Sequence, residues 1–574
     1  MGRTEKKKSF MINVAIVMFS QIAVKLLGMV YRVVITNISG FGDLGNGYLN
    51  SGYQVYTLLL AVSSIGIPNA IAKMTSERNA VGDYRGAHKI FKSAFLLFAA
   101  IGLFASALLY FGADFIAFSV IRMPGTQYVL KCLAPSILFV CLSSVIRGYF
   151  TGMENMKATS TSQVLEQFYK CLFTVVIVYS LAAFPQILSA ILNVAEDDAE
   201  RRAAFMASGA QIATTISTIL SFLYLVFFYN KRRKAIIEKI GSSDAPTIVK
   251  PLGQMFKSIL MISIPISLGS IISAVNRLID TATITRGIEI AFRELIPAYG
   301  NTAAIANPTL EQLSREAARL SGQLGKSDTL INLPLSINIA FSTVLVPVIA
   351  GALKKGDQKT ASDKISYSLM ISVLIALPCA IGYIALAKPI YGLLYPNAQL
   401  GYDLLQISAI AMIFTALNQT LSGSLQGVGK VFTPATGLLL GCIVKFILNV
   451  LLIRRPEINI YGAPISSIVC QIISFAYSFS VLRKQVAVKI SAAKYVIKPL
   501  ISAVLMGISA YIVHAGIMLI FANNLIAIIA AIAVAVVVYF AAVFLLKILN
   551  EDEVRQLPYG SKLLIILKKA GFYK

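Results

Sequence analysis

Eight charged side chains interrupt long apolar stretches of this 574-residue sequence. A charge near the centre of a bilayer costs about 2.5–3.5 kcal/mol on insertion scales, so it normally faces a partner or a wet cavity. Six of the eight are cations, and arginine binds phosphate through paired hydrogen bonds. The pattern therefore predicts a cavity for an anionic cargo. The eight residues are Lys25, Arg32, Arg147, Glu166, Lys170, Arg277, Asp280 and Lys445.

Four of these cations are candidate substrate ligands. Lys25 and Arg32 lie seven residues apart, which is about two helical turns and hence one helix face. Arg32 and Arg277 occupy the first apolar stretch of each half of the chain, so they are the best candidates for contact with a diphosphate. Arg147 lies near the end of its stretch, where it either contacts substrate or extends to the membrane surface.

The remaining charges are candidates for coupling or for ion pairs. Glu166 and Lys170 are i,i+4 neighbours, and Arg277 and Asp280 are i,i+3 neighbours, so each pair can partly neutralise itself. Asp280 is also the best carboxylate for a coupled proton or Na⁺, and this alternative stays open beside the neutralised one. Lys445 lies in a later apolar stretch, one turn before Asn449.

The elements that must position these residues are membrane helices. Hydrophobic residues make up 57% of the chain and charged residues 13%, with a mean hydropathy of +0.75, whereas soluble chains carry about 25% charged residues. Runs of about 20 apolar residues predict an all-α integral membrane protein and exclude a soluble enzyme or an outer-membrane barrel. We predict fourteen spans, at 10–37, 48–74, 90–112, 127–151, 159–184, 206–229, 256–282, 328–351, 365–386, 403–423, 432–453, 460–482, 496–519 and 524–548.

Most of the net charge of +25 lies in the segments between the spans. Basic clusters such as Lys231-Arg232-Arg233-Lys234 and Arg483-Lys484 fall on one predicted side, which the positive-inside rule makes cytoplasmic together with both termini. They meet membrane lipids rather than nucleic acid. The six cysteines and two histidines form no metal-ligand pattern, so no metal site is predicted.

An internal repeat organises the chain. The offset that carries Gly148–Gly152 onto Gly423–Gly427 also carries Lys170 onto Lys445, and Ile67-Pro68 resembles Val346-Pro347. We predict two six-helix lobes related by a pseudo-two-fold axis, followed by two further helices. The predicted divisions are a lobe at 1–230, a cytoplasmic linker at 231–255, a lobe at 256–482 with an outer loop at 286–327, two helices at 483–550 and a cytoplasmic amphipathic tail at 551–574.

Three segments outside the spans have patterns that bear on further roles. Residues 310–324 have helical apolar spacing and are either an interfacial helix at the outer mouth or a solvated part of the loop. The run Gly322-Gln323-Leu324-Gly325-Lys326-Ser327 has two residues between its glycines where a phosphate loop needs four. The acidic run at 196–200 lies on the outer side without a soluble domain, which disfavours a glycosyltransferase metal site.

Several motifs resemble the polysaccharide-export proteins of Gram-positive bacteria. The motifs are Ser143–Met156 followed by Ser162–Gln167, then Lys25–Arg32, Asn332-Leu333-Pro334 and Gln426–Lys430. They are similar to the stage V sporulation protein B group and the MurJ-type lipid II flippases of the multidrug/oligosaccharidyl-lipid/polysaccharide exporter superfamily. The resemblance implies a V-shaped fold with a central cationic cavity and Lys25 and Arg32 as cavity cations.

The resemblance also implies a function in the bacterial plasma membrane. It implies a monomeric flippase that works near cell-wall synthesis enzymes. Its cargo would be an undecaprenyl-pyrophosphate-linked sugar, with lipid II as the first candidate, which it moves to the outer leaflet. No cofactor is expected, and the energy comes from the membrane potential or a Na⁺ or H⁺ gradient. A cation-coupled multidrug exporter of the same superfamily and a membrane-embedded polysaccharide polymerase or ligase are the alternatives.

Related exporters can hold Na⁺ between the seventh and eleventh spans, as the resemblance implies. Here Lys445 is predicted to approach Asp280 and take the place of that ion, with Asn449 beside it. Leaving either partner alone in low dielectric would be costly. The sequence thus argues against a sodium site at this position.

Overall fold

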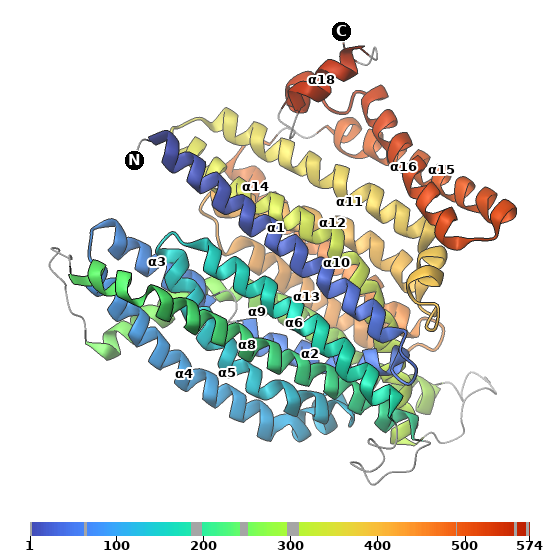
Figure 1. The fold of residues 1–574 in the computed structure, drawn as a ribbon. Coiled ribbons are helices and arrows are strands. Elements are labelled where there is room, and N and C mark those ends of the chain that lie inside the picture. Colours follow the sequence, from blue (N-terminus) through green and yellow to red (C-terminus); the bar gives the residue numbers. More distant parts are fainter. Residues whose placement is uncertain are drawn as a thin grey trace. The chain divides into compact units, whose positions relative to one another are not determined.

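A computed structural model describes residues 3–61, 66–184, 198–241, 251–295, 309–488, 491–555, 560–569 and 573 (Figure 1). Every regular element in these ranges is a helix, which confirms the all-α prediction. The helices are α1 (Arg3–Thr36), α2 (Gly42–Ala61), α3 (Ile67–Ala80), α4 (Tyr84–Phe115), η2 (Ile116–Ile121), α5 (Thr126–Gly152), α6 (Met156–Ala183), α8 (Ala199–Gly241), α9 (Leu252–Ile290), η3 (Ala291–Leu295), α10 (Leu310–Lys354), α11 (Gln358–Leu394), α12 (Tyr402–Gly427), α13 (Thr433–Leu452), η5 (Asn459–Tyr461), α14 (Gly462–Gln485), η6 (Ala493–Ile497), α15 (Lys498–Phe521), α16 (Asn524–Leu545), α17 (Glu551–Arg555) and α18 (Gly560–Lys569).

Ten of the described helices are long and apolar enough to cross a membrane. An eleventh candidate is the bent pair formed by Gly253–Ile264 and Ser267–Arg293, whose axes differ by 53° within the α9 region. The protein is therefore a multi-pass membrane protein. The exact set of fourteen spans and the side on which the termini lie stay predictions.

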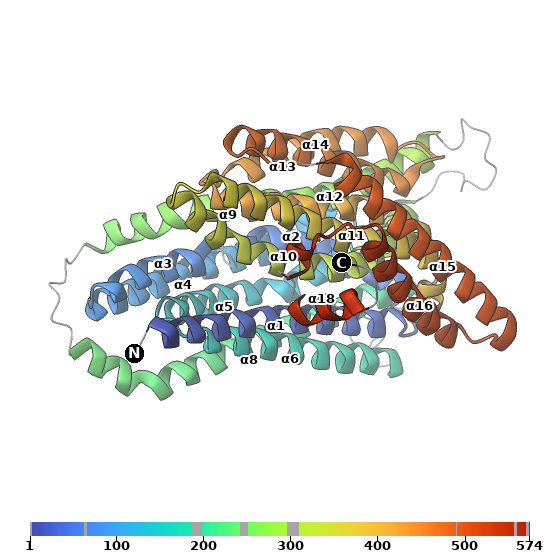
Figure 2. The ribbon, with the colours of Figure 1, turned by 90° about the horizontal axis from the view of Figure 1, so that it is seen from above.

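The contacts divide the chain into two units. Unit 1 comprises Met1–Lys326 and Phe446–Ala463, and unit 2 comprises Ser327–Lys445 and Pro464–Lys574. In unit 1, α1 packs on α6, α6 on α8, and α8 on α5, so these helices lie side by side (Figure 2). Helix α2 packs on α5, α8 and α9. These boundaries fall inside α10, inside α13 and in the first turn of α14, whereas the lobe boundaries expected from the sequence fall between spans.

The internal repeat has a structural basis in close helix packing. A Cβ atom on Gly148 of α5 would lie 2.7 Å from the carbonyl oxygen of Pro68 in α3. In unit 2, a Cβ on Gly423 of α12 would lie 2.8 Å from the carbonyl oxygen of Ser342 in α10. Both helix pairs approach so closely that only glycine fits, which explains why the repeat is most visible at these glycines.

The turns that precede two of the helices, α4 and α11, are also alike. Gly82 and Gly356 both have positive φ, at 76° and 73°, and each precedes an aspartate that caps the next helix. Asp83 accepts a hydrogen bond from the backbone N–H of Gly86 in α4, and Asp357 accepts one from Thr360 in α11. This second pair of matching turns agrees with the duplication that the repeated motifs predicted.

Helix α10 differs from the expected outer loop. It runs without a break from Leu310 to Lys354, so the predicted helix at 310–324 continues directly into the next predicted span. Ser314, Ala317 and Ala318 are fully buried, which makes the solvated alternative wrong. The glycine-containing run that begins at Gly322 is helical, so it is not a phosphate loop.

In unit 2, α15 and α16 form a hairpin that packs on α11 (Figure 1). Their buried side chains form one cluster with those of the tail, where Leu564 and Leu567 of α18 join Met370 of α11 and Met506 of α15. Lys494 also binds the Glu553 carboxylate of α17 at 2.7 Å. The predicted amphipathic tail is thus folded onto its own unit.

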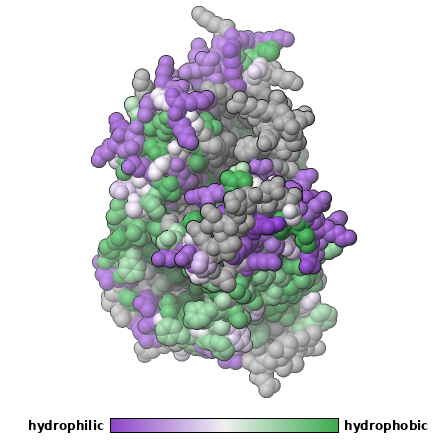
Figure 3. Space-filling view, turned by 90° about the vertical axis from the view of Figure 1, so that its left-hand side faces the viewer, coloured by the Kyte–Doolittle hydropathy of each residue, from purple (hydrophilic) through white to green (hydrophobic). Residues whose placement is uncertain are grey.

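Polar residues gather at the end of unit 1 where α3 meets α4. Figure 3 looks onto the left-hand side of the view in Figure 1, where both hydrophilic and hydrophobic side chains lie at the surface. Arg85 of α4 donates from Nε to the carbonyl oxygen of Ile240 in α8 at 3.2 Å, and Lys239 lies over the ring of Tyr84. Charged ends of this kind suit a membrane surface.

Candidate functional site

One face of α2 holds two of the predicted substrate ligands. Asn50 and Gln54 are four residues apart and therefore lie on the same face of the helix. Arg32 of α1 donates from a terminal nitrogen to Oδ1 of Asn50, and Arg277 of α9 donates from Nε to Oε1 of Gln54 at 3.2 Å. The structure thus brings Arg32 and Arg277 to one short surface of unit 1.

Lys170 of α6 reaches the same face of α2. Its ammonium nitrogen lies 4.8 Å from the ring centre of Tyr53, which follows Asn50 by three residues, and 5.7 Å from that of Tyr31 in α1. Tyr31 is buried and Tyr53 is half-buried. Lys170 is also close enough to Arg32 for the two positive charges to repel.

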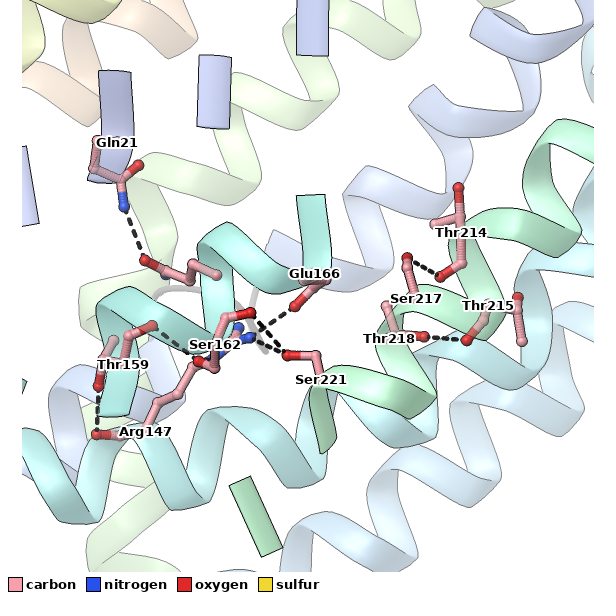
Figure 4. A network of polar contacts seen from close by, with 11 residues as sticks. Gln21, Arg147, Thr159, Ser162, Glu166, Thr214, Thr215, Ser217, Thr218 and Ser221 are labelled. Carbon is pink, nitrogen blue, oxygen red and sulfur yellow. Dashed lines mark hydrogen bonds and ion pairs between the residues drawn. The ribbon is translucent and has the colours of Figure 1, made fainter. Parts of the chain in front are cut away.

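Arg147 of α5 lies in a separate polar network, drawn in Figure 4. It donates to Oε2 of Glu166 in α6 at 2.7 Å, and to the hydroxyl oxygens of Ser162 and Ser221, both at 2.9 Å. The residue is only 9% exposed, so it does not extend to the membrane surface. Glu166 therefore pairs with Arg147 and not with Lys170, which corrects the pair expected from sequence spacing.

Lys25 stands apart from these groups. Its side chain is exposed on α1, two turns before Arg32. The shared helix face expected for the two residues follows from the unbroken helix α1. Lys25 therefore stays a predicted substrate ligand, on the part of α1 that precedes Arg32.

A second polar cluster joins α9 to the last part of α13. Asn449 is fully buried, and its side-chain nitrogen donates to Oδ1 of Asp280 at 2.9 Å and to the hydroxyl of Thr283 at 3.0 Å. The structure thus brings together Asp280 and Asn449. Lys445 is 1% exposed and belongs to unit 2, and its predicted approach to Asp280 stays a prediction.

The first half of α10 is joined to α2 by a buried ion pair. Lys326 Nζ lies 2.6 Å from Oδ1 of Asp43, and the lysine side chain is fully buried. Burial raises the pKa of the Asp43 carboxyl, although the ammonium of Lys326 opposes this shift. Glu200 of α8 adds a second link, because it accepts hydrogen bonds from Tyr48 of α2 at 2.6 Å and Ser314 of α10 at 3.3 Å.

Within the described ranges, no group of three or more His, Cys, Asp or Glu side chains could hold a metal ion. Of the acidic run at 196–200, positions 196 and 197 lie outside those ranges. Cations from three helices meet on α2, whereas at α9 the carboxylate of Asp280 meets the buried side-chain amide of Asn449.

Sequence reasoning found the cations but missed the neutral residues that hold them. Asn50, Tyr53 and Gln54 lie in a stretch with many polar residues, between Gly42 and Gln54, which lowers the hydropathy of a predicted span. Polar side chains at i, i+3 and i+4 in such a span were the available signal. The same spacing predicts one polar helix face, but not which cations it meets.

Two models of known protein families match the chain. A family model described as "Polysaccharide biosynthesis protein" matches residues 10–353, and one described as "Lipid II flippase MurJ" matches residues 322–539. Lipid II flippase MurJ of Bacillus subtilis (strain 168) is 24% identical over 507 residues, which cover 85% of this chain and 86% of the relative. Stage V sporulation protein B of the same organism is 22% identical and covers 97% of this chain and 99% of the relative.

Solved structures share the fold. A structure described as "Lipid II flippase MurJ, inward closed conformation" has a TM-score of 0.63 at 15% identity and covers 94% of this chain and 99% of its own. An inward-facing multidrug resistance MATE family transporter of the MOP superfamily has a TM-score of 0.60 at 13% identity, covering 81% of this chain and 99% of its own. At these identities the likeness concerns architecture, and both neighbours are transporters by name.

Proposed function

Because the chain belongs to the polysaccharide biosynthesis protein family, we propose that it is a flippase for an undecaprenyl-diphosphate-linked cell-wall precursor. Lipid II is the first candidate, since a relative named as a lipid II flippase matches over most of its length. Such a cargo cannot pass its sugar and diphosphate through about 30 Å of hydrocarbon unaided. The protein supplies a polar path from the cytoplasmic leaflet to the outer one.

The observation that carries this proposal is the pair of arginines held on α2. The amide oxygens of Asn50 and Gln54 orient the guanidinium groups of Arg32 and Arg277 without neutralising their charge. Charge-assisted hydrogen bonds from guanidinium to phosphate are stronger than neutral ones and are frequently bidentate. Arg32 and Arg277 bind the diphosphate, and Lys25 assists its approach along α1.

Transport energy comes from an ion gradient or the membrane potential, because the sequence holds no nucleotide-binding motif. Asp280 is the candidate coupling carboxylate, and it accepts a hydrogen bond from the side-chain nitrogen of Asn449, which also donates to the hydroxyl of Thr283. The protein acts as a monomer among membrane lipids, with both termini in the cytoplasm. Alternating access then exposes the site first to one leaflet and then to the other.

A cation-coupled multidrug exporter is the second candidate, and the architecture shared with the MATE family transporter favours it. Such an exporter would bind organic cations. The convergence of Arg32 and Arg277 on one face of α2 argues for an anionic cargo instead. Transport of lipid II and of a cationic dye, measured in the same vesicles, separates the two candidates.

The decisive experiment combines complementation with reconstitution. The full chain should restore growth to a bacterium depleted of its lipid II flippase, and should flip fluorescent lipid II in proteoliposomes. Arg32→Ala and Arg277→Ala should abolish flipping at normal expression, whereas Arg32→Lys should retain part of it. Lys131→Met, which removes a cation paired with Asp114 elsewhere in the unit, is the control and should retain activity. Full activity in Arg32→Ala would refute the assignment.

A further inference from the structure

Lys170 is held near Arg32 by aromatic rings rather than by a carboxylate. Its ammonium nitrogen lies within 6 Å of two tyrosine ring centres, the range in which a cation is attracted to a ring face. In the part of the chain that the structure describes, Lys170 forms no ion pair. Glu166, one turn away, is bound to Arg147.

The rings keep two like charges together. Arg32 repels Lys170, and this repulsion would drive a flexible lysine side chain away from α2. Attraction to the faces of Tyr53 and Tyr31 opposes the displacement without neutralising the ammonium. The charge of Lys170 is therefore kept beside that of Arg32.

Three cations from three different helices consequently share one face of α2. Asn50 holds Arg32, Tyr53 lies beneath Lys170, and Gln54 holds Arg277. The three holders occupy positions i, i+3 and i+4, so the cations follow one short line along the helix. Such a line suits an anion whose charged oxygens are spread over two phosphorus atoms.

We propose that Lys170 is a third headgroup ligand, which makes this site selective for a diphosphate over a single phosphate. The inference rests on the proposed function and adds the chemistry by which the cargo is recognised. An ammonium is a compact point charge with three donors, so it can leave the ring faces for a phosphate oxygen by a small rotation. Tyr31 and Tyr53 are positioning residues that keep it within reach.

Binding of two defined lipids tests the proposal. Full-length protein in detergent is titrated with undecaprenyl diphosphate and with undecaprenyl phosphate, and the dissociation constants are measured by thermophoresis. Lys170→Met should weaken diphosphate binding about tenfold and monophosphate binding less than about threefold, because one charge-assisted contact is lost. Lys170→Arg should stay within about threefold of the wild type for both lipids.

Two tyrosine variants distinguish positioning from mere packing. Tyr53→Phe keeps the ring face and should bind undecaprenyl diphosphate like the wild type. Tyr53→Leu removes the ring and should weaken that binding about threefold, since the lysine is then displaced by Arg32. Lys131→Met again controls for the loss of one positive charge, and melting temperatures show that each variant is folded.

Each outcome bears on one of the two proposals. If the wild type binds neither lipid and flips no lipid II, the proposed function fails. If the wild type binds undecaprenyl diphosphate but Lys170→Met and Lys170→Gln bind it equally well, only the role of Lys170 is overturned. Equal losses for diphosphate and monophosphate would also overturn it, because the lysine would then add charge without selectivity.

Discussion

The network around Arg147 allows a test of whether this cation is structural or binds substrate. Arg147 donates hydrogen bonds to Glu166, Ser162 and Ser221, which join α5, α6 and α8 (Figure 4). Arg147→Met keeps much of the side-chain volume and removes all three bonds. The variant leaves the Glu166 carboxylate in a half-buried position without its cation.

The expected loss of stability follows from the burial of the ion pair between Arg147 and Glu166. Breaking a buried ion pair costs about 3–5 kcal/mol, since the remaining charge stays in low dielectric. The Glu166 side chain is 27% exposed, so water solvates the remaining carboxylate in part. The expected loss of stability is therefore about 2–3 kcal/mol. For a unit of about 340 residues the unfolding entropy is roughly 0.7 kcal/mol per kelvin, so the melting temperature should fall by about 3–4 °C.

Thermal unfolding of the purified protein in detergent measures this shift. The double variant Arg147→Met/Glu166→Gln should recover at least half of the loss, because no unpaired charge remains. Ser221→Ala is the matched control for one lost hydrogen bond and should cost about 1 kcal/mol. An unchanged melting temperature in Arg147→Met, combined with lost transport, would refute the structural role and return Arg147 to the substrate ligands.

Three further predictions concern the scaffold. Gly148→Ala should lower the yield of folded protein in size-exclusion chromatography, because its Cβ would lie 2.7 Å from the carbonyl oxygen of Pro68, whereas Gly351→Ala meets open space and should be neutral. Burial raises the pKa of the Asp43 carboxyl, so folded unit 1 holds this proton to a higher pH than the unfolded chain does. The melting temperature should therefore fall as pH rises from the ordinary carboxyl pKa to the raised one, and Asp43→Asn should remove this step in a pH series. Asp83→Ala should cost about 1 kcal/mol in the thermal unfolding of unit 1 by removing the cap of α4, and Asp83→Asn should retain most of it.

The sequence predicted the parts of this fold that depend on local pattern. Apolar runs identified the helices, and the glycines of the repeat marked α5 and α12, where close packing excludes any Cβ. Helix ends such as Gly152 and Gly427 agree with the expected repeat to the residue. Pattern was sufficient here because each signal lies within one helix or at its end.

Partners across helices were less predictable. The i,i+4 spacing allowed a pair between Glu166 and Lys170, but Glu166 binds Arg147 in α5 and Lys170 lies near two tyrosine rings. Spacing along one helix determines which residues are neighbours on the surface of that helix. The rotation of each helix about its axis determines whether a side chain pairs with such a neighbour or with a residue of another helix. That rotation depends on packing of the whole unit, which no single stretch of sequence contains.

The segment expected to be an outer loop shows how that packing reaches the candidate site. A Cβ on Gly47 of α2 would lie 1.8 Å from the carbonyl oxygen of Ala318, and one on Gly322 would lie 1.8 Å from that of Asp43. One turn further, a Cβ on Gly325 would lie 1.5 Å from the side-chain nitrogen of Asn50, the residue that holds Arg32. The first turns of α10 therefore line one side of the candidate site on α2. Any displacement of α10 along α2 must also move Asn50, and with it the arginine proposed to bind the diphosphate.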